Sequence, residues 1–504
     1  MVTYYCGVHL SVSTMATAGT TYTKIYDVYK LSKLSDLVTV LIVEEGGEPI
    51  YKVIEPPLDE VEFATFRKVI DGLRSVMPAT EFRKMSKEEL WKFIRGKAES
   101  LAKKFLPKKY RTDVTLEKIL YYVRRDIVEY GKITPLIYDD LIEDISISKP
   151  NSPVYIWHSE YEYIKTNILL TEIEINDLTM KIAQKSKAVI SRAEPIVDAT
   201  LPEGHRAHIV LRGVAYAGTT IAIRKLLVKP FTPTELINRG TVSAEIMAYL
   251  WLLMDFKKSV LIYGDVGAGK TTLANAISLL IKPEYKVVTI EETREIRLPH
   301  KNWVALVTRE FTLDGLRKIT LFDLLKSSLR QRPDYIIVGE IRGEEAYTLF
   351  QAIAVGHGGI TTMHADTLES VIYRLTSEPM NIPPSLISLI QAFINIKRMK
   401  IDAKITRKVW LISEPRLENG GLNFTHIVKY NPKTNLWEYH FNESQVLRVI
   451  ANYLGIEFNE LIRRLEARTR YLKYLVTEGV TNFEDFVNAV RQYKEEEWLL
   501  LTGV

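Results

Sequence analysis

The feature that most constrains this chain is a glycine-rich stretch that directly follows a short apolar run. Residues 260–263 read Val-Leu-Ile-Tyr, as a buried strand does, and residues 264–271 match the pattern G-x-x-x-x-G-K-[ST]. Apolar residues then recur at helical spacing at Leu273, Ala276 and Leu280. Strand, glycine loop and helix in this order predict a loop whose backbone N–H groups surround phosphate groups at a helix N-terminus.

This loop predicts a nucleoside triphosphate site that uses Mg2+. Lys270 would add a positive charge at the phosphates, and the hydroxyl of Thr271 would coordinate Mg2+. A surface glycine loop is the alternative, and the agreement of the strand, loop and helix signals argues against it. The residues of this loop that we expect to bind the nucleotide are Gly264, Asp265, Val266, Gly267, Ala268, Gly269, Lys270, Thr271 and Thr272.

Composition narrows the class of protein. The 504 residues allow about three domains. Lysine and arginine number 67 against 62 acidic residues, and a net charge of +5 is too small at this length to predict nucleic acid binding. A single cysteine, Cys6, excludes a disulfide framework and a cysteine-rich zinc site. Since the sequence shows no signal peptide pattern and no apolar run of roughly 20 residues, we expect a cytoplasmic protein that needs a partner for work at the membrane.

The pattern of strands, helices and prolines predicts five segments. We expect an N-terminal α/β and helical module at residues 1–105, a helical linker at 106–134, a second α/β domain at 135–229, the core with the glycine loop at 230–415, and a hairpin with charged helices at 416–504. Helices are predicted at 60–73, 86–105, 116–130 and 178–191 in the first three segments. Pro230 and Pro233 predict a hinge in front of the core.

Strand and helix patterns alternate beyond this hinge. The predicted strands are 260–263, 287–290, 335–338 and 360–363. Such alternation predicts an α/β fold with a doubly wound parallel sheet whose binding site lies at the carboxyl ends of the strands.

One of these strands delivers an acid to that edge. Gly339 follows the strand at the usual position of a magnesium-binding aspartate, and Glu340 comes next. Asp334 cannot replace the missing aspartate, because six residues of extended strand put it roughly 20 Å from Glu340. Glu340 is therefore the predicted acid at the phosphates, where it would orient the attacking water or hold a magnesium-bound water.

Two further blocks end strands of the same sheet. Residues 291–295 form an acidic turn that begins with Glu291, and residues 356–364 end in His364, whose imidazole would reach a phosphate or sense a conformational change. The histidines lack the H-E-x-x-H spacing, so a transition-metal site is not predicted.

Taken together, the blocks 264–271, 291–295, 339–340 and 356–364 resemble, in residues and order, the secretion ATPase superfamily that powers type II secretion, type IV pili and conjugative type IV secretion. The resemblance implies a RecA-like P-loop ATPase core, preceded by a smaller PAS-like α/β domain and a further α/β and helical module. It also implies ATP as the nucleotide and catalytic roles for Lys270, Glu291, Glu340 and His364. The second box of the family usually reads I-E-D; here Glu292 replaces that Asp, so we assign the chemistry to Glu291.

The resemblance extends to the preceding domain. Residues 195–206 and 221–225 look like the part of the family whose arginines reach the nucleotide, which makes Arg206 and Arg224 candidate nucleotide ligands. His205 stands where a serine is common in archaeal members. The chain lacks the four-cysteine zinc subdomain of bacterial extension ATPases, and residues 53–57 look like the E-P-P element of archaeal members, so the archaeal branch fits better.

The resemblance implies a function. A homo-hexameric, Mg2+-dependent ATPase at the cytoplasmic face of the membrane would drive assembly of a pilus-like filament or a secretion machine. It would act through a polytopic membrane protein, touch filament subunits only indirectly, and bind no nucleic acid. A conjugation or nucleic acid motor is the first alternative, which the weak net charge disfavours. A scaffold that binds ATP without hydrolysing it is the second, and the presence of Lys270, Thr271 and Glu340 opposes it.

Overall fold

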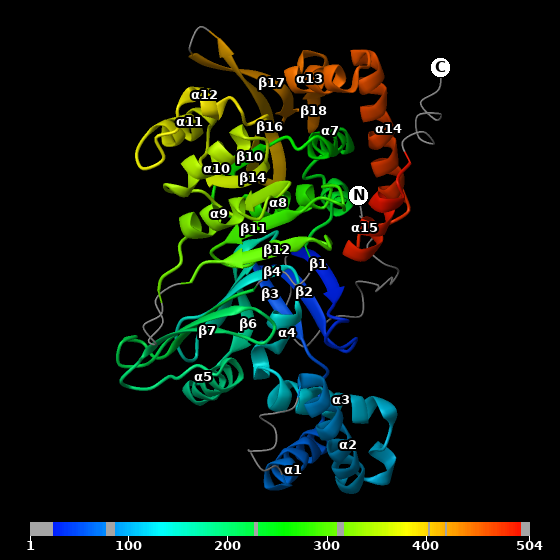
Figure 1. Ribbon diagram of the computed structural model, residues 1–504. Helices are drawn as coiled ribbons and strands as arrows, with labels where there is room; N and C mark the ends of the chain where they lie inside the picture. The colour runs from blue at the N-terminus through cyan, green and yellow to red at the C-terminus, as the bar shows by residue number, and fades with distance from the viewer. Residues whose placement is uncertain are drawn as a thin grey trace. The chain divides into compact units, whose positions relative to one another are not determined.

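The computed structural model describes residues 24–76, 86–225, 230–309, 317–401, 404–418 and 421–494. Cys6, residues 226–229 in front of the predicted hinge, and the last ten residues of the segment 416–504 lie outside these ranges. The chain forms two compact units, Met1–Leu226 and Leu227–Val504, which Figure 1 draws in blue to green and in green to red. Within the described ranges, every helix is too short or too polar to cross a bilayer.

The first unit is built on one sheet of nine strands in the order β1-β2-β3-β6-β5-β4-β9-β8-β7. The strands are β1 (Lys24–Lys30), β2 (Thr39–Glu45), β3 (Glu48–Ile54), β4 (Ile142–Ile147), β5 (Pro153–His158), β6 (Glu162–Leu169), β7 (Ile196–Thr200), β8 (Arg206–Val210) and β9 (Thr220–Arg224). Parallel pairing of β3 with β6, through Ile50 with Lys165 and Tyr51 with Thr166, joins the two predicted α/β parts into this sheet. That pairing spans more than a hundred residues, so no local pattern announces it.

Two helices of the first unit lie between these strands in the sequence. The short α4 is Thr134–Tyr138, and α5 is Glu172–Ser186. We predicted α5 at 178–191, which is too late in the chain. Thr171 and Glu174 form a capping box that begins the helix earlier, and Lys187 ends it in the left-handed conformation.

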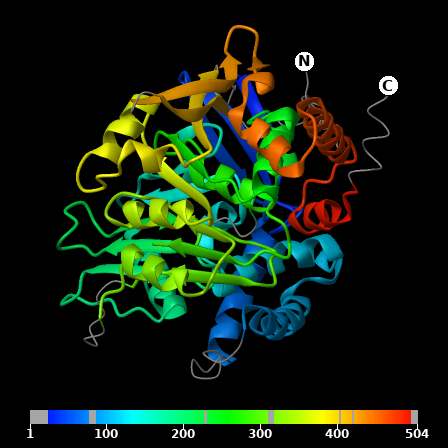
Figure 2. The same cartoon turned by 45° about the horizontal axis from the view of Figure 1, so that its top comes forward.

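Three helices of the first unit form a separate bundle, which Figures 1 and 2 show in blue at one end of the unit. They are α1 (Glu60–Val76), α2 (Lys87–Phe105) and α3 (Asp113–Val123), and they share a core that includes Val69, Leu73, Ile94 and Ile119. The predicted helix 116–130 begins earlier and ends sooner, because a π-helical turn at Arg124–Val128 follows α3.

The second unit confirms the predicted α/β class and the doubly wound, RecA-like sheet. Its order is β12-β11-β13-β14-β10-β15-β16-β17-β18. Pairing is parallel from β12 to β15 and antiparallel from β15 to β18. The strands are β10 (Val260–Gly264), β11 (Val287–Glu291), β12 (Trp303–Val307), β13 (Tyr335–Val338), β14 (Gly358–His364), β15 (Ala392–Ile401), β16 (Lys404–Glu418), β17 (Gly421–Asn431) and β18 (Leu436–Tyr439).

Helices cover both faces of this sheet because successive strand residues point to opposite sides. Val260 and Ile262 pack into a core with α7 (Ala244–Asp255), α8 (Lys270–Ser278) and the C-terminal helices, whereas Leu261 and Tyr263 pack against α10 (Glu345–Ala354) and α11 (Leu368–Thr376). The remaining helices are α6 (Pro233–Asn238), α9 (Leu321–Leu329), α12 (Pro384–Ile387), α13 (Gln445–Leu454), α14 (Phe458–Thr477) and α15 (Phe483–Gln492). Figures 1 and 2 show the yellow α11 and α12 on the side of this unit away from the red α14 and α15.

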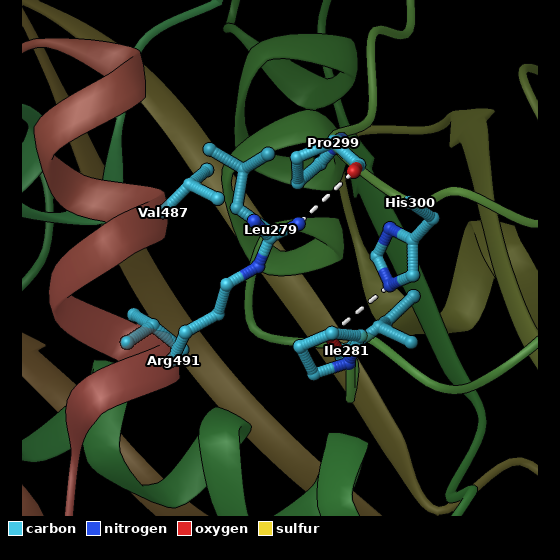
Figure 3. A pocket seen from close by; sticks show the side chains of 8 residues that line it. Leu279, Ile281, Pro299, His300, Val487 and Arg491 are labelled. Carbon is cyan, nitrogen blue, oxygen red and sulfur yellow. Dashed lines mark hydrogen bonds between the residues drawn. The ribbon is translucent and has the colours of Figure 1, made fainter.

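Helix α15 is attached to the rest of the second unit by a hydrogen bond and a small apolar contact. In Figure 3, Arg491 of α15 donates to the carbonyl oxygen of Pro299 at 3.2 Å, and Val487 lies beside Leu279. His300 Nε2 lies 3.2 Å from the carbonyl oxygen of Ile281, and burial lowers the pKa of this histidine. The contacts of Arg491 and Val487 anchor α15 on the loops that follow α8 and β11, and the contact of His300 joins these two loops.

A buried carboxylate ties the antiparallel extension to α13. Glu414 of β16 is 2% exposed, and its carboxylate accepts hydrogen bonds from Tyr249 Oη at 2.7 Å and from Ser444 Oγ at 2.5 Å. Its other oxygen accepts the backbone N–H groups of Gln445 and Val446 at 2.8 and 3.1 Å. Burial raises the pKa of Glu414 in spite of these bonds.

We predict that Glu414→Gln lowers the thermal midpoint of unfolding. The amide replaces one acceptor oxygen with a donor, so it faces donors that it cannot satisfy, and a buried mismatch of this kind costs about 2 kcal/mol. Calorimetry of the full chain measures the shift. Glu418→Gln, on the exposed part of the same strand, is the control; equal midpoints for both variants would contradict this role of Glu414.

Candidate active site

Parallel register brings the four predicted sequence blocks to one edge of the sheet in the second unit. Gly264 at the end of β10 pairs with His364 at the end of β14. Val338 of β13 pairs with Thr361 of β14 and with Ile290 of β11. Lys270, Glu291, Glu340 and His364 therefore follow or end neighbouring strands at their carboxyl ends.

The phosphate loop is shaped by close backbone contact. A Cβ on Gly264 would lie 2.2 Å from the carbonyl oxygen of Ile396 on β15, so this position accepts only glycine. Gly267 and Gly269 have φ values of +72° and +92°, which side chains disfavour. Helix α8 begins at Lys270, directly after Gly269. The loop thus turns its backbone around the N-terminus of α8, as the sequence predicts.

Lys270 is the buried cation of this site. It is 6% exposed, and its Nζ donates to the carbonyl oxygens of Gly264 at 3.0 Å and Asp265 at 2.8 Å. Burial lowers its pKa to about 8, although the charges of Glu340 and Asp265 act in the opposite direction. The ammonium thus lies inside the loop, where phosphate oxygens would replace the carbonyl oxygens as acceptors.

His364 connects this lysine to the predicted acid. Its Nδ1 lies 3.0 Å from Lys270 Nζ, and its Nε2 lies 3.3 Å from Glu340 Oε2. Burial, followed by the charge of Lys270, lowers the pKa of His364, which favours the neutral ring. In the tautomer that satisfies both neighbours, Nδ1 accepts from the ammonium and Nε2–H points to the carboxylate.

Glu340 stays ionised in these surroundings. Burial would raise its pKa, but hydrogen bonds from Arg342 and the charges of Arg342 and Lys270 outweigh burial and lower the pKa. Arg342 Nε and Nη2 donate to the two carboxylate oxygens at 2.9 and 2.8 Å. Arg342 also lies 3.9 Å from Glu292, which is more than half exposed at the rim of the site.

Glu291 is the opposite case. It is 3% exposed, and its Oε1 accepts the backbone N–H groups of Glu295 and Ile296, both at 2.9 Å. Its Oε2 is buried without a hydrogen-bond partner among the described residues. Burial outweighs the two backbone bonds and raises the pKa of Glu291 to about 7.

Gly339 lies beside this acid. A Cβ at Gly339 would be in ordinary van der Waals contact with Cγ of Glu291, at 3.4 Å. The usual aspartate is thus absent from β13, and Glu291 is the neighbouring carboxylate on β11. Asp334, at the far end of β13, instead accepts the backbone N–H of Lys286 at 2.8 Å.

The donor set suits Mg2+ held mainly by phosphate and water. Among the described residues, no group of three or more His, Cys, Asp or Glu side chains is placed to hold a metal ion. Thr271 in the first turn of α8 and the ionised Glu340 are the protein oxygens that we predicted for Mg2+. Mg2+ in such sites keeps several waters and binds substrate phosphates, so two protein oxygens suffice.

Arg206 and Arg224 lie together in the first unit. They face each other as Cα partners on β8 and β9. The Arg224 side chain is 71% exposed, and its Nε donates to Asp144 Oδ1 at 3.1 Å. His205, next to Arg206, is buried, and burial lowers its pKa to about 4. The action of both arginines on the nucleotide stays a prediction.

Sequence reasoning missed three arginines at the site. Arg407 Nε of β16 donates to the carbonyl oxygen of Gly267 at 3.0 Å, Arg374 of α11 donates to the carbonyl oxygen of His364, and Arg342 holds Glu340. Arg342 follows Glu340 by two residues in the sequence, and this spacing could have indicated the ion pair between them. Arg407 carries no local signal because the register of β16 places it.

Comparison with known proteins finds a matching family and several similar proteins. A family described as "Type II/IV secretion system protein" matches residues 127–488. The uncharacterized protein MJ0900 of Methanocaldococcus jannaschii is 32% identical over 502 residues, covering 92% of this chain and 91% of that protein. A putative conjugal transfer protein of Mycobacterium tuberculosis is 28% identical over 265 residues, covering 51% of this chain and 74% of that protein. The crystal structure of the Legionella pneumophila ATPase DotB has 19% identity and a TM-score of 0.43, covering 73% of this chain and 93% of that one.

We predict that Glu291→Gln gains stability relative to the natural chain as pH rises from 5 to 8. The folded-state pKa of about 7 lies above the ordinary 4.5, so the folded protein binds the extra proton between these values and loses stability as pH rises through 7. A shift of this size corresponds to about 3 kcal/mol at most. The difference in thermal midpoint between the two proteins, measured at each pH, should therefore grow. Glu292→Gln, at the exposed rim, should show no such trend, and a flat difference for Glu291→Gln would refute the burial argument.

Proposed function

Because this chain belongs to the type II/IV secretion system protein family, a family of secretion ATPases, we propose that it hydrolyses ATP to drive a pilus-type assembly or secretion machine. The observation that carries the proposal is the line from Lys270 through His364 to Glu340 at the phosphate loop. In this proposal, Lys270 is the cation for the phosphates and the ionised Glu340 is the acid for water, and both lie at the same edge of the sheet. Phosphoryl transfer depends mainly on such positioning and charge neutralisation.

The two acids at this edge suit different tasks. Water attacks the γ-phosphorus, the bond to the β–γ bridging oxygen breaks, and ADP and phosphate form. Glu340, ionised and held by Arg342, orients this water, and Glu291, whose pKa is about 7, takes its proton. Bound Mg2+ would neutralise charge on the phosphate oxygens. Lys270 exchanges its carbonyl acceptors for the β- and γ-phosphates.

The family and the relatives support a proposal for the setting of this ATPase. The relative from Methanocaldococcus jannaschii, matched over most of both chains, supports an archaeal type of machine. We assign the chain to a homo-hexamer at the cytoplasmic face of the membrane, where it acts through a polytopic membrane protein and reaches filament subunits only indirectly. Co-purification of the native assembly identifies that membrane partner.

Similarity to a conjugal transfer protein favours a second candidate, a motor for nucleic acid. The net charge of +5 over 504 residues gives little attraction for a phosphate backbone. Turnover that rises on addition of single- or double-stranded DNA would favour this candidate. Turnover that rises only with membrane fractions would favour the filament machine.

We predict that Lys270→Ala loses tight ATP binding, whereas Glu340→Gln binds ATP and hydrolyses it about 10³-fold more slowly. The first change removes the charge at the phosphates, and the second removes the water-orienting carboxylate. Nucleotide titration and steady-state phosphate release measure the two effects. Hydrolysis should also stop in EDTA and return with added Mg2+.

The control for this pair is Lys301→Ala, which removes an exposed lysine from the same unit. It should bind and hydrolyse ATP as the natural chain does. Unchanged ATP affinity in Lys270→Ala would sink the assignment of the phosphate loop.

We predict that Arg206→Ala and Arg224→Ala each slow turnover at least about tenfold while the chain stays folded and oligomeric. A guanidinium can hold γ-phosphate oxygens bidentately, so its loss removes transition-state stabilisation without altering the phosphate loop. The control is Arg212→Ala, which removes an exposed arginine of the same unit that pairs with Glu172. A distance probe across residues 230–233 should also differ between ATP and ADP; normal turnover in both variants would remove the arginines from the mechanism.

A further inference from the structure

A partly buried ion cluster links helix α2 to the turn in front of Arg206. Its members, called the Lys87 cluster, are Lys87, Glu129, Tyr130 and Glu203. Lys87 Nζ lies 2.7 Å from Glu129 Oε2 and 2.9 Å from Glu203 Oε1. Tyr130 Oη donates to the other oxygen of Glu203 at 2.7 Å. Four groups from three distant parts of the first unit thus meet at one point.

The position of Lys87 in helix α2 is electrostatically unfavourable for the helix. Lys87 is the first residue of α2, where the positive end of a helix disfavours a cation. A capping box fixes this start, because Ser86 Oγ accepts the N–H of Glu89 at 3.2 Å and Glu89 accepts the N–H of Ser86 at 2.8 Å. The Lys87 side chain is only 24% exposed. A lysine placed here is explained by the two acids that it meets and not by helix stability.

The acids of the cluster need this cation. The side chain of Glu129 has no exposed surface, and its other oxygen lies 3.3 Å from Arg124 Nε and 2.8 Å from Tyr138 Oη. Burial would lower the pKa of Lys87, but Glu129 and Glu203 outweigh burial and raise it, so the ammonium stays charged. Loss of one partner from such a buried set leaves an uncompensated charge, which is costly.

Glu203 belongs to the tight turn that leads into β8. The N–H of Leu201 bonds to the carbonyl oxygen of His205 at 2.8 Å, and the N–H of Gly204 bonds to that of Leu201 at 2.8 Å. Gly204 has a φ of +90°. Arg206 follows as the first residue of β8. Lys87 and Tyr130 together fix Glu203, and so fix the turn three residues before the arginine.

The bundle that carries Lys87 is itself fastened to the sheet. Glu55, at the end of β3, accepts from Tyr121 Oη of α3 at 2.6 Å and from Arg125 Nη1 at 2.9 and 2.7 Å. Tyr122 Oη donates to the carbonyl oxygen of Pro56 at 2.8 Å. The E-P-P element of the sequence therefore anchors the bundle. The family match begins at residue 127, so α2 contributes Lys87 from outside the matched region.

We propose that Lys87 is a positioning residue for Arg206: through Glu203 it holds the turn that aims this arginine, and the helical bundle α1–α3 thereby sets the rate of hydrolysis. The inference rests on the proposed role of Arg206 at the nucleotide. Lys87 touches neither nucleotide nor reacting atoms. Its loss should affect kcat and leave binding at the phosphate loop of the second unit intact.

The experiment is a double-mutant cycle on the full-length chain with ATP. Lys87→Met, Arg206→Ala and the double variant are compared for kcat, KM and thermal midpoint. Lys87→Met should lower kcat roughly 10- to 100-fold, since small misplacements of a reacting partner have effects of this size. KM should change less than about twofold, and Lys87→Arg, which keeps the charge, should recover most of the turnover. Lys92→Met, at an exposed position of the same helix, should behave as the natural chain.

The cycle separates positioning from stability. If Lys87 acts through Arg206, adding Lys87→Met to Arg206→Ala should change kcat less than about twofold. If each change lowers kcat independently, so that the two reductions multiply in the double variant, the inference is overturned. A normal kcat in Lys87→Met would overturn it as well. Glu203→Gln repeats the cycle if Lys87→Met does not fold. Normal hydrolysis by Arg206→Ala alone would instead refute the proposed role of the arginine, and with it this inference.

Discussion

The second unit depends on holding the charge of Lys270 in a place that water barely reaches. Burial disfavours the ammonium, and only a complete set of acceptors keeps it there. Those acceptors come from the phosphate loop and from His364, which ends β14. They meet only when β10 and β14 pair in the observed register, with Gly264 opposite His364. The burial of the Lys270 charge therefore depends on the register of β10 and β14. The backbone of Ile396 lies close to Gly264, so the position of β15 matters as well.

At the same edge of the sheet, the two acids have opposite surroundings. Glu340 accepts two hydrogen bonds from Arg342 and lies near Lys270, and these cations lower its pKa below the ordinary range. Glu291 is buried beside Gly339 with backbone N–H groups on one oxygen only, and its pKa rises to about 7. Two carboxylates whose surroundings move their pKa values apart are suited to different roles in proton transfer.

The elements and residues that sequence reasoning predicted are those with local signals. Four apolar runs become parallel strands, and each predicted catalytic residue of this unit lies at their common edge. Where contacts between distant segments decide, the prediction fails or is silent. Strand β12 and the long β15 and β16 went unpredicted, since β15 joins the sheet by pairing with β10 and β16 then pairs with β15. Arg407 reaches Gly267 only through that pairing. Helix α5 is a different failure, because its capping box was present in the sequence and was not used.

The two units use the same physical device for different ends. In each, a lysine at the beginning of a helix carries its charge into a buried cluster, and its partners come from segments far apart in the chain. Lys270 meets carbonyl oxygens of the phosphate loop and His364, and in the function that we propose phosphate oxygens replace the carbonyl oxygens. Lys87 instead meets two carboxylates of the chain itself. Buried ion clusters contribute little net stability but penalise every arrangement that leaves a charge unpaired. Such a penalty gives the turn before Arg206 a defined position, which the role that we propose for Arg206 at the γ-phosphate requires.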